Sequence, residues 1–289
     1  MSRPKILLCL DTDPHPSVFD GVVAVDAGVD HLLRYGGVRP ADVRDLVYGA
    51  MFTRGGDDLR HTAVFVGGGA VAAGEGGLKA VCGSFFCPPA VSAKLDSNGA
   101  NTTAAAAVIA ARRHVGLRGA TVTVLAATGS VGSRVVRLMA SSGAQVRVVS
   151  RKLTHAEGTC DRVAASVPGA DLLPLHAEDE PGFAATLEGA HVVVSCGPPG
   201  VSLLSERALA ANPTLEVAID LNAVPPVGLG GINPQAKAER RHDRLCYGAL
   251  GVGGTKMKIH RAAIAQLFTA NDQVFDLEQI YEIGLRIEE

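Results

Sequence analysis

The sequence contains no tryptophan, and only 4% of its 289 residues are aromatic. This scarcity disfavours surfaces that bind sugars or nucleic-acid bases by stacking. No apolar run approaches the roughly 20 residues that a membrane helix needs. The formal net charge of −2 gives no support for a nucleic-acid or anionic-membrane partner. We therefore expect no nucleic acid and no membrane among the partners of this chain.

The cysteines and histidines also lack the spacing of a metal site. Six cysteines and nine histidines are scattered along the chain, without a CxxC pair or a comparable cluster. Scattered thiols in a chain of this size indicate a reducing cytoplasm. The N-terminal "MSRPKILLCLDTD" fits a first β-strand better than a signal peptide, because its short apolar run ends in two acids. We expect a cytoplasmic protein with no bound metal.

Apolar runs of four to seven residues alternate with segments of helical period, which predicts an α/β protein with mostly parallel sheets. In the first part, strands are expected at 5–10, 62–66 and 90–95, and helices near 17–34, 40–51 and 70–82. In the second part, strands are expected at 121–127, 145–150, 172–175, 191–195, 216–221 and 245–249. An alanine-rich helix over 102–114 connects the parts. The tail is expected to be helical, with Asp276 and Gln279 forming a capping box.

This pattern predicts two domains. The first is an open α/β domain made of residues 1–104 together with residues 255–289. The second is a Rossmann-type, doubly wound parallel sheet over residues 118–254. Residues 105–117 are expected to form a linker helix.

Two glycine-rich segments compete as the dinucleotide site. "VFVGGGAVAAG" matches the formal template better, but its helix would contain Gly74, Gly76 and Gly77, each costing roughly 0.5–1 kcal/mol relative to alanine. "AATGSVG" has an alanine at the first position, yet the helix 131–142 has no interior glycine and the unit closes in about thirty residues. We favour the second segment over an ordinary glycine turn. Its candidate phosphate-binding residues are Thr128, Gly129, Ser130, Val131 and Gly132.

A basic pair follows the next strand, where NAD-binding proteins often carry an acid. Ser150 is followed by Arg151 and Lys152, which would attract the 2′-phosphate of NADP. A solvated charge pair is the alternative. Other strand ends supply candidates for the nicotinamide-ribose end of the cofactor, because ligands bind at the carboxyl edge of open sheets. These are Cys196, Gly197, Asp220 and Asn222.

An acidic pair near the N-terminus points to a rival enzyme class. "ILLCLDTDPH" resembles the opening motif of haloacid-dehalogenase-type phosphatases, in which Asp11 would be the nucleophile and Asp13 a general acid. The later acidic motif of those enzymes is missing, because "AIDLNA" supplies only Asp220. The alternative is that the pair forms hydrogen bonds at a strand end or lines a cleft.

Several segments together resemble the NADP-dependent methylene-tetrahydromethanopterin dehydrogenases of C1-metabolising bacteria. They are "LDTDPHPSVFD", "MFTRGG", "VFVGGGAVAAGE", "LDSNGANTTAAAA", "ATGSVG", "SRKL", "LNAVPPVGLGGI" and "GALGVGGTKMKIHRAAIAQLF". They span nearly the whole chain in order. The resemblance implies a pterin-binding first domain, an NADP-binding Rossmann domain and a homo-oligomer (a dimer, trimer or hexamer). Where the family typically has Gly-Thr-Gly-Pro-Val-Gly, this chain has Ala127-Thr-Gly-Ser-Val-Gly132.

The resemblance also implies a reaction, namely hydride transfer from methylene-tetrahydromethanopterin to NADP⁺ in one-carbon oxidation. This chemistry needs positioning rather than a general base. Methylene-tetrahydrofolate is the main rival substrate. An unrelated NADP-linked dehydrogenase of a small carbonyl compound or amino acid, and a non-catalytic NADP-binding sensor, are further alternatives.

The family places a lysine in the pterin cleft at the position of Lys256, which we expect in a glycine-flanked turn, orienting the polar edge of the pterin. Lys258 is expected to be solvated. Phe19 is a candidate to pack on the pterin ring, or alternatively a core residue. Polar candidates surround the start of the alanine-rich helix, although Asn101 or Thr102 could simply cap it. These candidates are Ser97, Asn98, Thr102 and Thr103.

Overall fold

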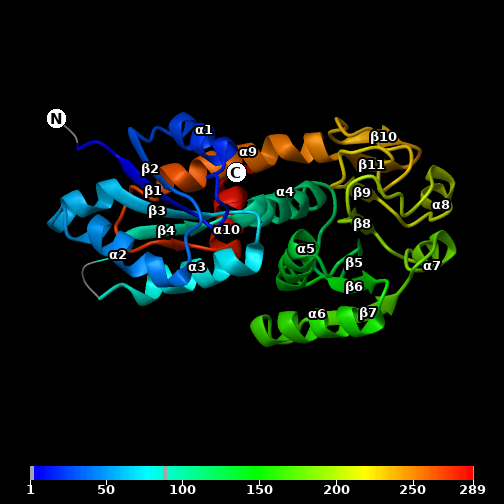
Figure 1. Cartoon of the computed structure of the whole chain (residues 1–289). Helices are drawn as coiled ribbons and strands as arrows, with labels where there is room; N and C mark the ends of the chain where they lie inside the picture. The colour runs from blue at the N-terminus through cyan, green and yellow to red at the C-terminus, as the bar shows by residue number, and fades with distance from the viewer. Residues whose placement is uncertain (1–2, 87–89, 289) are drawn as a thin grey trace. The chain divides into compact units, whose positions relative to one another are not determined.

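A computed structural model describes residues 3–86 and 90–288. The chain divides into two compact units (Figure 1). Unit 1 comprises Met1–Thr102 and Met257–Glu289, and unit 2 comprises Thr103–Lys256. Among the described residues, no helix combines the length and the apolarity needed to cross a membrane. Each unit is a mostly or entirely parallel sheet with helices packed on it, so the α/β class expected from the alternating pattern is confirmed.

Unit 1 contains a five-stranded, entirely parallel sheet in the order β12-β4-β3-β1-β2. The strands are β1 (Ile6–Asp11), β2 (His31–Tyr35), β3 (Thr62–Gly67), β4 (Ser92–Leu95) and β12 (Val274–Phe275). The helices are α1 (Val18–Asp26), α2 (Pro40–Met51), α3 (Val71–Gly83), the start of α4 (Ala100–Arg112), the end of α9 (Ala249–Gln266) and α10 (Leu277–Glu288). The order reverses direction between β1 and β3, which is where doubly wound sheets bind ligands.

The core of unit 1 forms where helices cover the strands. Apolar side chains of α2 and α3, such as Val47 and Val81, pack against inward-facing residues of β1 and β3, such as Leu8 and Val64. Figure 1 shows α2 and α3 on one face of this sheet and α1 on the other. Residues of β1 and β3 are buried on both faces, which explains why these strands have continuous apolar sequences.

The helix expected over 17–34 is too long, because the chain there forms a helix and then a strand. Helix α1 ends at Asp26, and Gly28 has a φ of +83° that stops the helix. The following strand β2 lies at the edge of the sheet, and most of its side chains are exposed. It therefore lacks the buried alternation that would have distinguished it from a continuing helix.

Helix α3 forms despite its three interior glycines. A Cβ on Gly74 would lie 2.8 Å from Cβ of Ser97, and one on Gly77 would lie 3.1 Å from a methyl carbon of Val66. The glycines therefore let the helix approach β3 and the 3₁₀ turn Ser97–Gly99 closely. Close packing outweighs the intrinsic helix penalty that argued against this segment.

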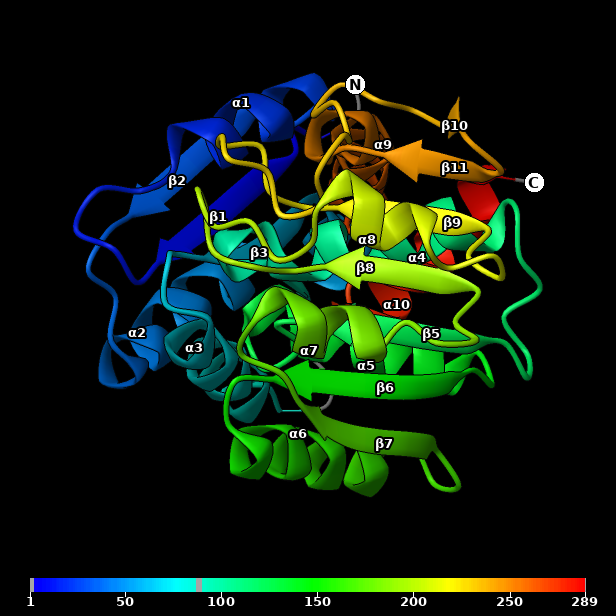
Figure 2. The same ribbon diagram turned by 90° about the vertical axis from the view of Figure 1, so that its right-hand side faces the viewer.

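Unit 2 contains a seven-stranded sheet in the order β10-β11-β9-β8-β5-β6-β7, which Figure 2 shows from one side. The strands are β5 (Thr121–Leu125), β6 (Gln145–Ser150), β7 (Asp171–His176), β8 (Val192–Ser195), β9 (Val217–Asp220), β10 (Glu239–Arg241) and β11 (Arg244–Tyr247). The remaining helices are α5 (Ser130–Ser141), α6 (Leu153–Ser166), α7 (Glu180–Ala185) and α8 (Glu206–Ala210). Only the edge strand β10 pairs antiparallel among the described strands. The six parallel strands have the 3-2-1-4-5-6 order of the Rossmann fold, as expected.

The glycine-rich segment near residue 250 is helical, not a turn. Helix α9 begins at Ala249 and includes Lys256, so the turn expected around Lys256 is wrong. A Cβ on Gly251 would clash with the carbonyl oxygen of Ala236, so glycine there permits close packing on the preceding loop. The tail is helical as expected, and the backbone N–H of Asp276 donates to Oε1 of Gln279 at 3.2 Å, which is half of the expected capping box.

The glycines of α3 provide a test of this packing. Gly74→Ala should lower the free energy of unfolding by at least about 1–3 kcal/mol, because the new methyl group would overlap Ser97. Gly76→Ala is the matched control in the same helix, since its Cβ would have nothing within 4 Å. It should raise the stability by about 0.5–1 kcal/mol. Urea unfolding measures both, and equal effects of the two substitutions would contradict the close packing.

Candidate functional site

The favoured glycine turn connects β5 to α5 in unit 2. The left-handed residue in it is Ala126, with a φ of +52°, and not Ala127. Ala127 is fully buried, and its N–H donates to the carbonyl of Val149 at 3.0 Å. The tight turn is therefore made one residue before the first template position, which explains how the chain accommodates alanine at that position.

Gly129 and Gly132 differ in what surrounds them. A Cβ on Gly132 would lie 2.8 Å from backbone atoms of Ala126 and Ala127, so this glycine is required by helix–turn packing. A Cβ on Gly129 would have only the carbonyl of Ala126 nearby, at 4.0 Å. Gly129 is the N-cap of α5, and no side chain of the described residues caps the helix there. Backbone N–H groups at this helix start can therefore donate hydrogen bonds to an anion.

Thr128, Ser130 and Val131 lie in the same turn and the first turn of α5, and all three are half-buried. The basic pair lies at the adjacent strand end, because β5 and β6 are neighbouring parallel strands. Ser150 is buried, and its Oγ accepts from the N–H of Lys152 at 3.4 Å. Arg151 and Lys152 are exposed.

The candidates at the ends of β8 and β9 take part in the loop that follows. Asp220 is 1% exposed and accepts from the N–H groups of Asn222 and Leu229, at 3.2 and 3.0 Å. The side chain of Asn222 donates to the carbonyl of Pro226 at 3.1 Å. With these contacts, Asp220 and Asn222 hold the loop over 222–231.

Burial also determines the ionisation of the side chains of Cys196 and Asp220, at the ends of β8 and β9. Burial raises the pKa of the Cys196 thiol to about 12, with a smaller contribution from Asp220. Burial likewise raises the pKa of Asp220, although its backbone hydrogen bonds oppose the shift. Cys196 is therefore a neutral thiol near pH 7 and not a nucleophile. The neighbouring Gly197 is half-buried.

In unit 1, the acidic pair after β1 holds loops in place. Asp11 accepts from the N–H groups of Asp13 and Ser17, both at 2.9 Å, and Asp13 accepts from the N–H of Gly69 at 2.8 Å. No group of acidic, histidine or cysteine side chains in the described residues could hold a metal ion. The hydrogen-bonding alternative therefore accounts for both residues.

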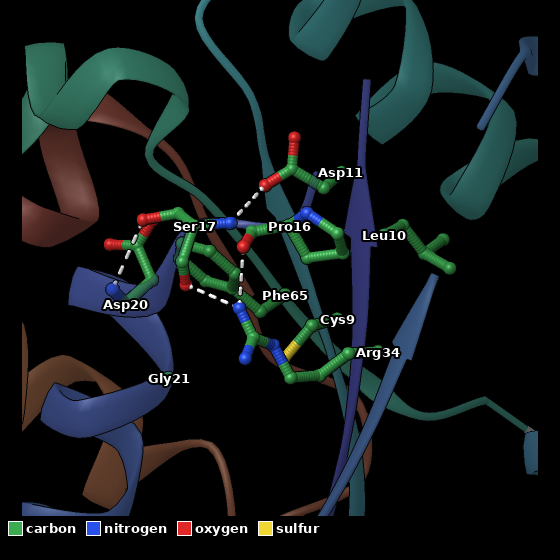
Figure 3. A pocket seen from close by; sticks show the side chains of 9 residues that line it. All are labelled: Cys9, Leu10, Asp11, Pro16, Ser17, Asp20, Gly21, Arg34 and Phe65. Atoms are coloured by element: carbon green, nitrogen blue, oxygen red, sulfur yellow. Dashed lines mark hydrogen bonds between the residues drawn. The ribbon is translucent and has the colours of Figure 1, made fainter. Parts of the chain in front are cut away.

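A small pocket lies beside this loop, at the carboxyl end of β1 (Figure 3). The guanidinium of Arg34 donates to the carbonyls of Pro16 and Ser17, at 2.6 and 2.7 Å. Ser17 caps α1 by accepting from the N–H of Asp20. The lining residues are Cys9, Leu10, Asp11, Pro16, Ser17, Asp20, Gly21, Arg34 and Phe65.

The polar candidates near the start of α4 separate into two groups. Ser97 and Thr102 are buried, and their hydroxyls donate to the carbonyl of Gly67 and the carboxylate of Asp96. These contacts favour a structural role. Asn98 is exposed with a φ of +53°, and Thr103 is half-buried.

The side-chain amide of Asn101 donates to the carbonyl of Leu95 and to Asp276. Asp96 caps the start of α4 by accepting from the N–H of Thr102 at 3.1 Å. Phe19 is not a core residue, since it is 52% exposed on α1.

Sequence reasoning missed a buried ion cluster in unit 1. Lys94, Asp96 and His260 are each at most 1% exposed. Nζ of Lys94 lies 3.1 Å from Oδ2 of Asp96 and 2.9 Å from Nδ1 of His260, and that Nδ1 lies 2.9 Å from the same Asp96 oxygen. A lysine inside an otherwise apolar strand, two residues before an acid, was the available signal.

The ionisation of this cluster follows from its contacts. Burial by itself would raise the pKa of Asp96. The ammonium of Lys94 and the hydrogen bond and charge of His260 outweigh burial and hold the pKa well below its usual range. Lys94 also lies over the ring of Phe65, 4.9 Å from its centroid. The cluster therefore contains a paired carboxylate and ammonium, not two neutral groups.

Lys256 lies half-buried on α9, and Lys258 is exposed. Lys256 is four residues before His260 on the same helix, so the two side chains share one helix face. Lys256, which the family resemblance singled out, and His260, which sequence reasoning missed, thus lie on the same helix, α9.

Comparison with protein families identifies both parts of the chain. Residues 18–98 match the family described as Methylene-tetrahydromethanopterin dehydrogenase, N-terminal. Residues 118–211 match the NmrA-like family. The chain is 43% identical to the Bifunctional protein MdtA of Methylorubrum extorquens, over 97% of this chain and 98% of that protein. It is also 30% identical to the NAD(P)-dependent methylenetetrahydromethanopterin dehydrogenase of the same organism, over 98% of both.

Solved structures agree on the fold. Shikimate 5-dehydrogenase from Listeria monocytogenes is 15% identical with a TM-score of 0.54, over 97% of this chain and 96% of that chain. Quinate dehydrogenase from Corynebacterium glutamicum is 15% identical with a TM-score of 0.51, over 98% of this chain and 100% of that chain. At such identities they show the fold and nothing more. The two full-length relatives show the family: this chain belongs to the methylene-tetrahydromethanopterin dehydrogenases.

Proposed function

We propose that this protein oxidises methylene-tetrahydromethanopterin to methenyl-tetrahydromethanopterin with NADP⁺ as the hydride acceptor. The observation that carries the proposal is the glycine turn after β5 with Arg151 and Lys152 at the end of the adjacent strand. The names of the two full-length relatives supply the substrate class, and one of them is named as NAD(P)-dependent. We further propose that it acts in the cytoplasm as a homo-oligomer, as the family resemblance implies.

The proposed reaction balances without a proton-transfer step. The C–H bond of the methylene carbon breaks with both of its electrons, and the remaining positive charge is shared by the two adjacent nitrogens. NADP⁺, when bound, accepts the hydride on its nicotinamide ring. The chain's own residues therefore have to bind, orient and exclude water. This demand agrees with Cys196 and Asp220, whose raised pKa values and internal hydrogen bonds make them structural supports.

The residues after β5 and β6 fit a phosphorylated dinucleotide. Gly129 leaves open space beside the uncapped start of α5, where backbone N–H groups can bind the pyrophosphate. Arg151 and Lys152 are exposed at the neighbouring strand end, where they can pair with a 2′-phosphate. Thr128, Ser130 and Ser150 supply hydroxyl groups in the same region.

For the pterin, the candidates are residues of α1, of the turn after β4 and of the start of α4. Phe19, Asn98 and Thr103 are accessible to a ligand, whereas Ser97 and Thr102 support the turn from within. We assign to Lys256 the role of orienting the polar edge of the pterin. An ammonium directly at the forming cation would oppose the reaction.

The decisive experiment is a spectrophotometric assay of NADP⁺ reduction with methylene-tetrahydromethanopterin, using the purified full-length enzyme. Parallel assays replace NADP⁺ with NAD⁺, and the substrate with methylene-tetrahydrofolate. Turnover with the tetrahydromethanopterin compound supports the proposal. Faster turnover with the folate would reassign the substrate. NADPH binding without turnover on either pterin would make the protein a sensor or a dehydrogenase of another substrate.

Arg151→Ala tests the preference for the phosphorylated cofactor. Loss of an exposed, charge-assisted contact to the 2′-phosphate should raise the Michaelis constant for NADP⁺ by about tenfold. The constant for NAD⁺ should barely change, because NAD⁺ lacks this phosphate. Arg112→Ala, another exposed arginine of unit 2, controls for the general loss of charge. Equal effects of Arg151→Ala on the two cofactors would refute the assigned role.

Gly129→Ala tests the phosphate-binding turn independently of cofactor choice. The added methyl group enters space that the fold leaves open, so the free energy of unfolding should change by less than about 1 kcal/mol. The Michaelis constants for NADP⁺ and NAD⁺ should both rise, by about tenfold or more, because the methyl group displaces the pyrophosphate. Unchanged constants would place the dinucleotide elsewhere. Gly132→Ala, which clashes with backbone, should instead destabilise unit 2.

A further inference from the structure

Unit 2 exposes few large apolar side chains, and most of them lie at one edge of its sheet. Five are exposed over residues 103–256. Four follow the carboxyl ends of β6, β8, β9 and β11, and the fifth lies within β7; in this order they are Leu153, Val201, Val224, Leu250 and Leu173. A single exposed apolar residue is ordinary on a protein surface. Four at the edge where open sheets bind ligands point to contact with a ligand.

Three of these side chains belong to one half of the sheet. A doubly wound sheet binds a dinucleotide across the point where its strand order reverses, which lies here between β5 and β8. The proposed phosphate contacts follow β5 and β6, so the adenosine end of the cofactor belongs to the half made of β5, β6 and β7. The nicotinamide end then belongs to the half made of β8, β9 and β11, which carries Val201, Val224 and Leu250.

The backbone that carries Val224 is held firmly. The N–H of Val224 donates to the side-chain oxygen of Asn222 at 2.9 Å. The N–H of Leu203 donates to the carbonyl of Gly228 at 2.9 Å, which joins the loop after β8 to the loop after β9. The side chain of Val224 is nevertheless 50% exposed. A fixed backbone thus holds an apolar side chain in an open position at the edge of the sheet.

The polar groups at the same strand ends serve the protein itself. Asp220 and Asn222, which the sequence suggested for the nicotinamide-ribose end, hold the loop over 222–231 through their own hydrogen bonds. The neutral thiol of Cys196 adds no charge there. The side chains that remain open toward a ring are therefore the apolar ones, and the polar candidates support them.

Apolar contact suits the proposed chemistry. The nicotinamide ring is cationic in NADP⁺ and neutral in NADPH. Apolar surroundings disfavour a charged group relative to a neutral one, so they favour the ring in its reduced form. A wall of this kind therefore assists acceptance of the hydride without any proton transfer.

We propose that Val201, Val224 and Leu250 form an apolar wall against which the nicotinamide ring of NADP packs. The inference rests on the proposed function for the identity of the cofactor and goes beyond it by naming the side chains that meet the reactive ring. Val224 is the best residue for a test, because its backbone is fixed and its side chain is open, so a substitution there changes the surface and spares the core.

Val224→Thr tests the wall through the fluorescence of bound NADPH. Threonine has nearly the shape of valine and adds a hydroxyl group. The dihydronicotinamide ring emits more strongly in apolar surroundings, so the wild-type enzyme should enhance the emission of NADPH. Val224→Thr should reduce that enhancement by roughly half. The dissociation constant of NADPH should stay within about threefold, because charge-assisted contacts to the phosphates carry most of the affinity.

Two further variants make the result specific to an apolar surface at this position. Val224→Ile keeps the side chain apolar and should retain the emission of the wild type. Val274→Thr introduces the same hydroxyl at an exposed valine of β12 in unit 1 and should change neither the emission nor the affinity. Thermal unfolding verifies that each variant folds. Emission of NADPH on Val224→Thr equal to that on the wild type would overturn the proposal.

Val201→Thr extends the test to the neighbouring loop. It should also reduce the emission of bound NADPH, and the double variant with Val224→Thr should show less emission than either single variant. In the enzyme assay, Val224→Thr should lower kcat for NADP⁺ reduction by about three- to tenfold. Full emission on both the Val201→Thr and the double variant would overturn the wall.

The fluorescence measurement needs no pterin, so it separates this inference from the proposed reaction. A wild-type enzyme that shows the expected emission, reduced by Val224→Thr, but does not turn over methylene-tetrahydromethanopterin would contradict the proposed function and support the wall. A wild-type enzyme that turns over the pterin while Val224→Thr leaves the emission unchanged would contradict the wall alone. Failure of the wild type to bind NADPH would contradict both.

Discussion

The buried ion pair between Lys94 and Asp96 is the constraint on which the carboxyl edge of the sheet in unit 1 depends. Taking two charges out of water is costly, and removing one partner of such a pair typically costs about 3–5 kcal/mol. Lys94 belongs to β4, while Asp96 also caps α4 through Thr102. His260 brings α9 to the same point. One carboxylate therefore fixes a strand end and two helices, and the shape of the pocket edge follows from satisfying it.

Close packing at glycine is the corresponding constraint in both units. Gly74 lets α3 approach Ser97, and Gly132 lets α5 approach the turn after β5. In each case the glycine is needed by the protein itself and gives no information about a ligand. Gly129 is different, since a side chain there would meet almost nothing in the fold. A position that the fold leaves open, beside the start of an uncapped helix, is where a ligand explains the residue better than packing does.

Much of the fold could be predicted from the sequence because parallel strands buried on both faces have continuous apolar sequences. Strand β6 and helix α2 have the expected boundaries, and the Rossmann order of unit 2 agrees with the predicted class. The two wrong predictions of secondary structure share a cause. Strand β2 and the start of α9 are governed by tertiary contacts, an exposed sheet edge in one case and glycine packing on Ala236 in the other. Local sequence patterns do not contain those contacts.

The candidate site was predictable to the extent that its residues lie at strand ends. The turn after β5 and the basic pair after β6 could be placed because each follows a recognisable strand. The ion cluster could not, since Lys94 and His260 are 166 residues apart and meet only in the folded unit. The proposed hydride transfer needs no general base, so the sequence contains no acid–base pair that would mark the site. What it needs instead is positioning of the substrate, which leaves no pattern of acid–base residues in the sequence.

The proposed cofactor-binding pair and the buried ion cluster therefore differ in how easily their residues can be substituted. Arg151 and Lys152 are exposed at a strand end, so altering them costs the fold little and cofactor preference can vary within the family. His260, Lys94 and Asp96 are buried and mutually dependent, so altering any of them disturbs the fold as well as the pocket. The residues proposed to select the cofactor thus lie on a surface that tolerates substitution, whereas the ion cluster of unit 1 is a network that does not.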